Sequence, residues 1–152
     1  MALDIRSIQD KLVSHALATG HFDSVNETKI DEPAGAGAVT CGIWADDIAP
    51  IRSSGQASTS VRIVFKVRIF ASTESAPESY LDPAMIDATS TLMNAYSGDF
   101  ELSGDARAID LLGMAGVTLS ANAHYMNLSG IIFRVMDITV PVLLNDVWEQ
   151  SP

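Results

Sequence analysis

The stretch Ser60–Ala71, SVRIVFKVRIFA, decides the fold. Five apolar side chains occupy every second position, at Val61, Ile63, Phe65, Val67 and Ile69. Three of the chain's 9 basic residues lie between them, at Arg62, Lys66 and Arg68. Because successive side chains of a strand point to opposite faces, the pattern predicts a β-strand with one apolar and one cationic face. At ~3.3 Å per residue this strand spans roughly 40 Å, which is long for a strand and predicts the centre of a sheet.

Length and composition predict one soluble domain. A chain of 152 residues is long enough to bury a sizeable core, so we predict a single domain spanning residues 1–152. Cys41 is the one cysteine, which excludes an internal disulfide. No apolar run approaches the ~20 residues of a membrane span, and charged residues begin at Asp4. We therefore expect neither a membrane partner nor a secretory signal.

The charge balance is strongly acidic. The chain has 9 Lys and Arg residues against 19 Asp and Glu residues, which gives a net charge of −10. Nucleic-acid binding through phosphate neutralisation needs the opposite balance, so we do not expect specific DNA binding. An acidic wall suits a surface along which DNA slides without being held.

The N-terminal residues predict an amphipathic helix. Apolar residues recur at three- and four-residue steps over Asp4–Thr19, with Asp4 as a suitable N-cap and Gly20 as a suitable left-handed end. His15 and His21 flank the end of this helix, where an imidazolium ion interacts favourably with the helix dipole. We therefore interpret both histidines as capping residues.

A loop and a strand follow this helix. Phe22–Glu32 has no clear periodicity, and PAGAGA at residues 33–38 is not followed by the residues of a phosphate-binding loop, so both predict loop. Val39–Ala45 predicts a strand that closes at Asp46-Asp47. Residues 48–51 lead into a further loop over residues 52–59, which precedes the long strand, and we expect these two strands to pair antiparallel.

Asp82-Pro83 predicts the start of a second helix, because Asp is a good N-cap and Pro fits the first helical position. We expect this helix to run to Ser97. The side chains expected to face the core are Met85, Ile86, Thr89, Leu92, Met93 and Tyr96. Asp99–Gly116 mixes short apolar pieces with glycines and predicts a short strand and turns.

The last third predicts a hairpin. Val117–Tyr125 and Ile132–Val142 both alternate apolar residues, and Asn127–Gly130 between them predicts a turn. The sequence NDVWEQSP at residues 145–152 predicts a short exposed tail with Trp148 as an anchor. The order of helix, strands, helix and strands predicts an α+β fold, a mainly antiparallel mixed sheet with two helices packed on one face.

Two residues of the last strand need special places. Arg134 has the parity of the apolar side chains, and a buried unpaired charge is costly. We expect Arg134 either near the exposed end of the strand or paired with a carboxylate such as Asp110 or a neighbour of Asp137. Pro141 has no N–H for the ladder, which predicts a sheet edge or a bulge.

The sequence offers no catalytic pattern. Cys41 lies in an apolar strand and His124 in another, so we expect a buried hydrophobe and a surface residue instead of a nucleophile and its base. Asp46 and Asp47 are adjacent in a strand and would point to opposite faces, so they do not predict a metal site. We therefore predict a protein that is not an enzyme and has no catalytic residues, no metal and no cofactor.

Several phrases along the chain resemble siphophage tail terminator proteins, most closely those of phages that infect actinobacteria. These phrases are the Trp44 strand ending in DDIAPI (residues 46–51), VRIVFKVRIF (61–70), the Leu81-Asp82-Pro83 helix start, the GDFEL turn (98–102), and Tyr125 followed by FRVM (133–136) and VPV (140–142). The likeness covers nearly the whole chain in the order of its elements.

The resemblance implies a virion structural protein. Such proteins form a hexameric ring that caps the tail tube, ends its polymerisation and joins it to the head-completion complex. The implied partners are further copies of the chain in a homohexamer, the tail tube protein and the head–tail stopper or connector protein. Double-stranded DNA would pass through the lumen without specific binding. The implied location is the head-proximal end of the virion tail, after synthesis in the host cytoplasm.

Candidate interaction residues follow from charge and from this resemblance. For the contact between subunits we select the cationic strand face with two further side chains: Arg62, Lys66, Arg68, Arg134 and Trp44. A solvated outer sheet face is the alternative interpretation of the cationic residues. For the lumen that DNA traverses we select acidic residues near turns: Asp46, Asp47, Asp99 and Glu101.

Two alternative functions stay open. One is another head–tail connector such as a stopper, or a tail tube subunit, which would stack indefinitely where a terminator stops at one ring. The other is a small-molecule binding α+β domain or enzyme, which would need a deep apolar pocket with convergent polar groups.

Overall fold

The computed structural model describes residues 4–28, 39–51, 58–73, 78–128 and 130–149. The predicted loops at residues 33–38 and 52–57 lie outside these ranges. In chain order the elements are α1 (Ile5–Thr19), β1 (Ser24–Asn26), β2 (Thr40–Ile51), β3 (Ser58–Ser72), α2 (Glu78–Gly98), the 3-10 turn η1 (Leu102–Gly104), β4 (Ala108–Ile109), β5 (Ser120–Leu128) and β6 (Ile131–Glu149).

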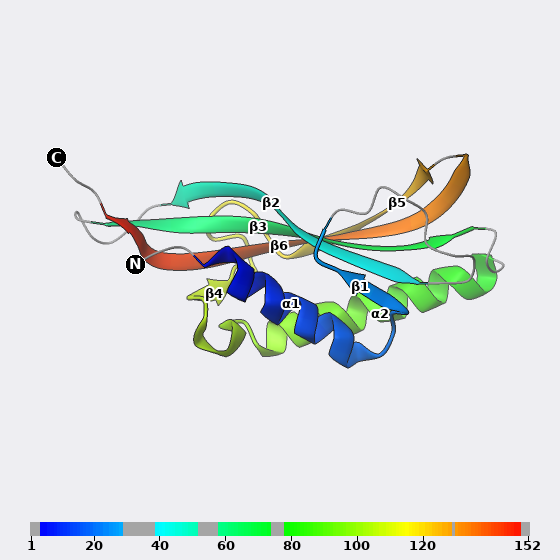
Figure 1. Cartoon of the computed structure of the whole chain (residues 1–152), viewed down its shortest axis with the longest axis horizontal. Helices are drawn as coiled ribbons and strands as arrows, with labels where there is room; N and C mark the ends of the chain where they lie inside the picture. The colour runs from blue at the N-terminus through cyan, green and yellow to red at the C-terminus, as the bar shows by residue number, and fades with distance from the viewer. Residues whose placement is uncertain (1–3, 29–38, 52–57, 74–77, 129, 150–152) are drawn as a thin grey trace.

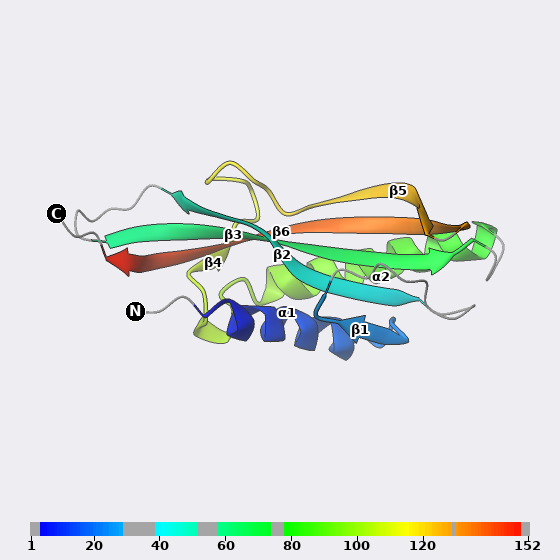
Figure 2. The same ribbon diagram turned by 45° about the horizontal axis from the view of Figure 1, so that its top comes forward.

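The described strands form one mixed sheet in the order β1-β2-β3-β6-β4, and β5 also pairs with β6. Only β1 and β2 are parallel; the other pairs are antiparallel. Both helices cover the same face of the sheet, as Figures 1 and 2 show. The predicted α+β class is confirmed. We call the sheet face that the helices cover the helix face, and the opposite one the outer face.

The long central strand is confirmed as the core of the molecule. All five alternating apolar residues of β3 have 0% exposed area, and they pack under Ile8, Leu12 and Ala16 of α1 together with Leu92 and Tyr96 of α2. At ~25 cal/mol per Å², complete burial of each such side chain contributes roughly 1.5–3 kcal/mol to folding, so this strand and its covering helices form the principal hydrophobic cluster.

The ends of α1 are as predicted, whereas the role of His15 is not. The Asp4 carboxylate accepts a hydrogen bond from the Ser7 N–H at 3.0 Å, and Gly20 has φ +71°, a left-handed value that glycine adopts readily. His15 does not cap α1. Its Nε2 lies 2.8 Å from Asp99 Oδ2, and its ring meets Tyr96 edge-on, so it joins α1 to the end of α2.

The prediction of loop over Phe22–Glu32 missed β1. This short strand runs parallel to β2, and Val25 packs against the core. It is fixed at its start by Asp23, whose N–H donates to the Val39 carbonyl at 2.9 Å and whose carboxylate accepts from the Val39 N–H at 2.8 Å. β1 has three residues, and only one of them has an apolar, half-buried side chain. Such a short strand shows no alternation of apolar and polar residues in the sequence.

The prediction that β2 closes at Asp46-Asp47 is wrong. β2 continues to Ile51, and a β-bulge between Ala45 and Asp47 shifts its register against β3. The two aspartates break the apolar alternation, but β3 supplies a pairing partner along the whole segment. One edge of β2 pairs with β3, and the opposite edge has no described partner beyond Gly42. Pro50 is compatible with this free edge, because its missing N–H removes no ladder hydrogen bond there.

The predicted start of α2 is also wrong. The helix begins at Glu78, so Pro83 lies inside it, where its missing N–H removes one intrahelical bond. Burial of Leu81 in the core explains why the helix extends past the proline on its N-terminal side. Ile86 was expected to face inward, yet it is 59% exposed, and Ala88 occupies the core position instead.

The predicted C-terminal tail is in fact the end of β6. This strand runs to Glu149, with Thr59 paired to Trp148 and with Val147 buried. The predicted hairpin turn is confirmed, since Leu128 pairs with Ile131 and Gly130 has φ +84°. Its first strand begins at Ser120, three residues later than predicted.

Pro141 lies in an interior strand but faces a local gap. On that side of β6 the pairing with β5 ends at Thr139, and the pairing with β4 begins at Val142. The Pro141 carbonyl accepts from the Asp110 N–H at 2.8 Å, and the Asp110 carbonyl in turn accepts from the Leu119 N–H at 3.3 Å. The Leu119 N–H thus replaces the donor that proline lacks.

Candidate functional site

The cationic face of β3 lies on the outer face of the sheet, and its side chains have partners within the chain. Arg68 makes a bidentate ion pair with Asp137 on β6, with distances of 2.8 and 3.0 Å. Its guanidinium group also lies over the Trp44 ring, 5.2 Å from the centroid. His124 Nε2 on β5 approaches the same carboxylate at 2.7 Å. Four strands therefore contribute to one partly buried cluster centred on Asp137.

The charge of Asp137 is stabilised by this arrangement. Burial alone would raise the pKa of the Asp137 carboxyl, but hydrogen bonds from Arg68 and His124, with their positive charge, outweigh burial and lower the pKa. The carboxylate stays ionised at neutral pH and neutralises the Arg68 guanidinium. Arg68 is consequently a structural residue of the outer face as well as a predicted interface residue.

Lys66 and Arg62 are bound less completely. The Lys66 ammonium donates to the Thr139 hydroxyl at 2.8 Å, a neutral partner. Arg62 Nη1 donates to the Ala115 carbonyl at 2.7 Å, and its Nη2 lies 3.5 Å from Asp47. Within the described part of the chain, the buried Nε of Arg62 has no hydrogen-bond partner.

Arg134 is paired, but not with the carboxylates considered from the sequence. Its Nε lies 3.2 Å from Asp82 Oδ1 on α2, and its guanidinium lies over the Tyr125 ring, 4.6 Å from the centroid. Asp82 was expected to cap a helix that began beside it; because α2 begins earlier, its side chain is available to Arg134. The need for a carboxylate was predicted correctly, although the partner was not.

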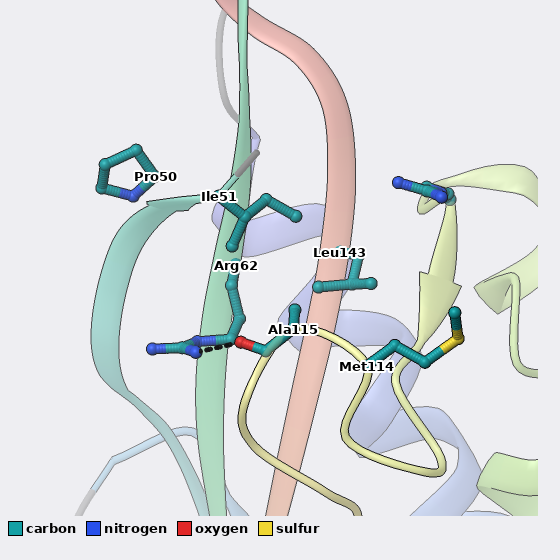
Figure 3. A pocket seen from close by; sticks show the side chains of 7 residues that line it. Pro50, Ile51, Arg62, Met114, Ala115 and Leu143 are labelled. Atoms are coloured by element: carbon teal, nitrogen blue, oxygen red, sulfur yellow. Dashed lines mark hydrogen bonds between the residues drawn. The ribbon is translucent and has the colours of Figure 1, made fainter. Parts of the chain in front are cut away.

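A groove of about 460 Å³ opens on the outer face beside Arg62 (Figure 3). Its described lining is mainly apolar, with two guanidinium groups: Pro50, Ile51, Arg62, Arg107, Met114, Ala115 and Leu143. Arg107 donates to the Asn145 side-chain oxygen at 3.3 Å and makes no ion pair with any described carboxylate. This lining suits the binding of an anionic group attached to an apolar one, because it combines guanidinium donors with apolar surface.

One wall of the groove is the β4–β5 loop, which Asp110 holds in place. The Asp110 side chain is buried, and its two oxygens accept hydrogen bonds from the Met114 and Ala115 N–H groups, both at 2.8 Å. The loop exposes Leu112 at 87% and Met114 at 91% to solvent. An ordered loop that presents large apolar side chains outward is typical of an interaction surface.

Replacing Asp110 with alanine is expected to release this loop. The Met114 and Ala115 N–H groups lose the acceptor of two partly buried hydrogen bonds, and we expect a loss of about 2–3 kcal/mol in the free energy of unfolding. Hydrogen exchange should show faster exchange of the Met114 and Ala115 amides, with little change in β3. Asp105→Ala is the control, since Asp105 is exposed and accepts only from the Ser7 hydroxyl among the described side chains. Unchanged protection of both loop amides would contradict the role given to Asp110.

The four predicted lumen residues are not gathered in one place. Asp46 and Asp47 are exposed within β2, whereas Asp99 and Glu101 lie in the turn after α2. The Ser103 N–H and His15 both donate to Asp99, and these hydrogen bonds lower the pKa of its carboxyl. Glu101 is exposed. Of the four, Asp99 has the clearest structural role.

The Cys41–His124 pair considered from the sequence does not form. Cys41 is fully buried on the helix face, where burial raises the pKa of its thiol to about 12, while His124 lies on the outer face beside Asp137. The described residues contain no group of three or more His, Cys, Asp or Glu side chains placed to hold a metal ion. No helix among them is both long and apolar enough to cross a bilayer.

Neither the groove nor the loop that walls it was predicted from the sequence. Arg107, Met114 and Ala115 lie in a segment that predicted only turns, and they meet Arg62 through the pairing of β4 with β6. Asp110, ahead of a glycine-containing turn, was the available signal, because Asp side chains commonly accept from N–H groups of a following turn. No protein-family model matches the chain, and no curated protein matches its sequence.

Proposed function

We propose that this chain is a structural virion protein of the tail-terminator type, which assembles into a closed hexameric ring on the end of a phage tail tube. The ring ends tube growth and presents a surface to the head-completion proteins. The resemblance of the sequence to siphophage tail terminators gives the proposal its direction, and the surface of the subunit supports the structural class.

The observation that carries the proposal is a long sheet that exposes large apolar side chains toward both of its ends. Strands β3 and β6 extend past α1 at one end (Figure 1), where Trp148, paired with Thr59, is exposed. Ile48 is also exposed, on the part of β2 that pairs with Ile63. At the other end the β5–β6 hairpin exposes Tyr125 and Ile132. Two different patches on one subunit favour head-to-tail contacts, which close into a ring when the rotation between neighbours permits.

The edge strands support the same class. No described strand pairs with the outer edge of β5, which contains neither proline nor lysine. The free part of β2, by contrast, carries a bulge, two aspartates and Pro50, all of which oppose strand addition. One open and one protected edge allow a subunit to add a neighbour in one direction without uncontrolled sheet growth.

The net charge of −10 suits a ring that DNA crosses without being held. Asp46 and Asp47 remain proposed lumen residues, because they are exposed and adjacent on β2. Of the residues proposed for the subunit interface, Arg62, Lys66, Arg68 and Trp44 share the outer face and must bind a neighbour around the internal contacts described above. Arg134 does not belong to this surface, because it pairs with Asp82 of α2 on the helix face. Arg62 and Arg68 each make an ion pair, whereas Lys66 makes none with a described carboxylate and donates to the Thr139 hydroxyl.

Electron microscopy of the purified chain, alone and mixed with tail tubes, tests the proposal. We expect closed rings, or a distinct cap at one end of each tube, and tubes that no longer elongate when fresh tube protein is added. Long tubes formed by the chain alone would instead identify a tube subunit. A chain that neither forms rings nor binds tubes would overturn the proposal and return attention to small-molecule binding at the groove.

A further inference from the structure

The turn between α2 and β4 is strained in a way that turns seldom are. Leu102 and Ser103 are consecutive non-glycine residues with φ of +49° and +57°. Left-handed conformations are costly for such side chains, of order 1–3 kcal/mol each, and persist only where the surroundings impose them. Strained backbone of this kind is concentrated at functional sites, so the turn is a candidate for a functional role.

The surroundings hold the turn firmly. Leu102 is fully buried in the core. The Asp99 carboxylate accepts from the Ser103 N–H at 2.9 Å and meets His15, while the Glu101 carbonyl accepts from the N–H groups of Gly104 at 3.0 Å and Ala106 at 3.2 Å. The consequence is a turn held by several contacts, in which an aromatic residue is followed directly by an acidic one.

These two side chains are Phe100 and Glu101, and both face solvent. Phe100 is 44% exposed, and Glu101 is exposed and makes no ion pair with a described cation. Placing an apolar and an acidic side chain on a strained, fixed turn prepares them for a partner at little further entropic cost. The complementary surface must offer apolar contact beside a positive charge.

The groove on the outer face has that composition. Leu143, Ile51 and Met114 supply its apolar surface, and Arg107 supplies a guanidinium group without an ion pair among the described residues. The β4–β5 loop that walls the groove, coloured yellow in Figure 2, lies beyond the outer face, whereas the chain around η1 lies on the helix side. The turn and the β4–β5 loop of one molecule thus lie on different sides of the sheet, although the turn adjoins the Arg107 segment, since the Glu101 carbonyl accepts from the Ala106 N–H.

We infer that the groove beside Arg62 binds the Phe100-Glu101 turn of a second copy of this chain. Glu101 of one copy pairs with Arg107 of the next, and Phe100 packs against Met114 and Leu143. The contact joins two different patches, so it is of the head-to-tail type, and it gives the proposed ring, on which this inference rests, a specific interface. It assigns Glu101 to the contact between copies and leaves Asp46 and Asp47 to the lumen.

Charge exchange between the two positions tests the inference. The full-length variants Arg107→Glu, Glu101→Arg and the double variant are compared with the unaltered chain by sedimentation velocity over a concentration series. Each single variant places like charges together, so we expect its self-association to weaken at least about tenfold. The double variant restores opposite charges and should return to within about threefold of the unaltered chain.

Lys11→Glu and Asp10→Lys are the matched controls. Both residues lie on α1 and do not line the groove, and the two substitutions change the net charge by the same amounts as Arg107→Glu and Glu101→Arg. Neither is expected to change self-association. Arg107 and Glu101 are exposed, and thermal unfolding of each variant verifies that the fold is retained.

Single variants that associate like the unaltered chain would overturn the inference, as would a double variant that is not restored or an unaltered chain that stays monomeric. Failure here is distinguishable from failure of the proposed function. Rings or tube caps formed by both single variants would remove this interface and leave the terminator proposal standing. Restored association that yields only open chains or dimers would support the interface and remove the closed ring.

Discussion

Replacing Phe65 with alanine is expected to lower the free energy of unfolding by about 3–5 kcal/mol, the largest effect of any single change considered for this chain. Phe65 is a fully buried residue at the middle of β3, on the face that the helices cover. β3 pairs with β2 on one side and with β6 on the other. Truncation removes its transfer free energy and leaves a cavity that long, paired strands cannot close easily. Chemical denaturation monitored by circular dichroism measures the difference.

The control for Phe65→Ala is Ile86→Ala on α2. Both residues are apolar and both were expected to face the core, but Ile86 is 59% exposed. We expect its truncation to change the free energy of unfolding by less than about 1 kcal/mol. A cost for Ile86→Ala equal to that for Phe65→Ala would mean that α2 packs with a different face toward the sheet.

Replacing Asp137 with asparagine is expected to cost about 2–4 kcal/mol at neutral pH, because it leaves the Arg68 guanidinium partly buried without its charge partner. The effect depends on pH. Since the folded-state pKa of Asp137 is lowered below the unfolded value of about 3.9, the carboxylate stabilises the fold above that value. This contribution is lost as pH falls below about 4 toward the folded-state pKa.

Denaturation of both proteins from pH 7 down to pH 2 measures this dependence. The difference in stability between the unaltered chain and Asp137→Asn should shrink as pH falls below about 4, where the carboxylate becomes protonated. Asp46→Asn, at an exposed position of β2, should change stability by less than about 0.5 kcal/mol across the range. A difference that stays constant from pH 7 to pH 2 would show that the Asp137 charge does not support the fold.

Elements with a strong internal pattern could be predicted from the sequence. The alternation in β3 and the three- and four-residue steps in α1 each specify a face that must be buried, and both elements are as expected. The errors fall where pairing or packing overrides local pattern. β2 continues through Asp46 and Asp47 because β3 pairs with it there, and α2 continues past Pro83 because Leu81 is buried.

The side-chain contacts on the two faces of the sheet were less accessible to the sequence. Arg134 needed a carboxylate, but Asp82 is 52 residues away and becomes available only through the position of α2 on the sheet. Asp137 joins Arg68 to His124 because three strands are in register at that point. The groove depends on a loop shaped by Asp110. These contacts join residues that are far apart in the sequence, and they depend on how the strands pair and where α2 packs. The spacing of residues along the chain therefore does not predict them.

The antiparallel pairing of β3 with β6 has a mechanical consequence. Their pairing extends from Ser58 opposite Glu149 to Ser72 opposite Phe133, nearly the whole length of β3. A pull directed along these strands loads their hydrogen bonds in shear, so many bonds must fail together, whereas a pull across the strands would open them one after another. A subunit built this way resists stretching along the strands and is softer across them. In an assembly under tension, the orientation of this pair would decide which loads the subunit withstands.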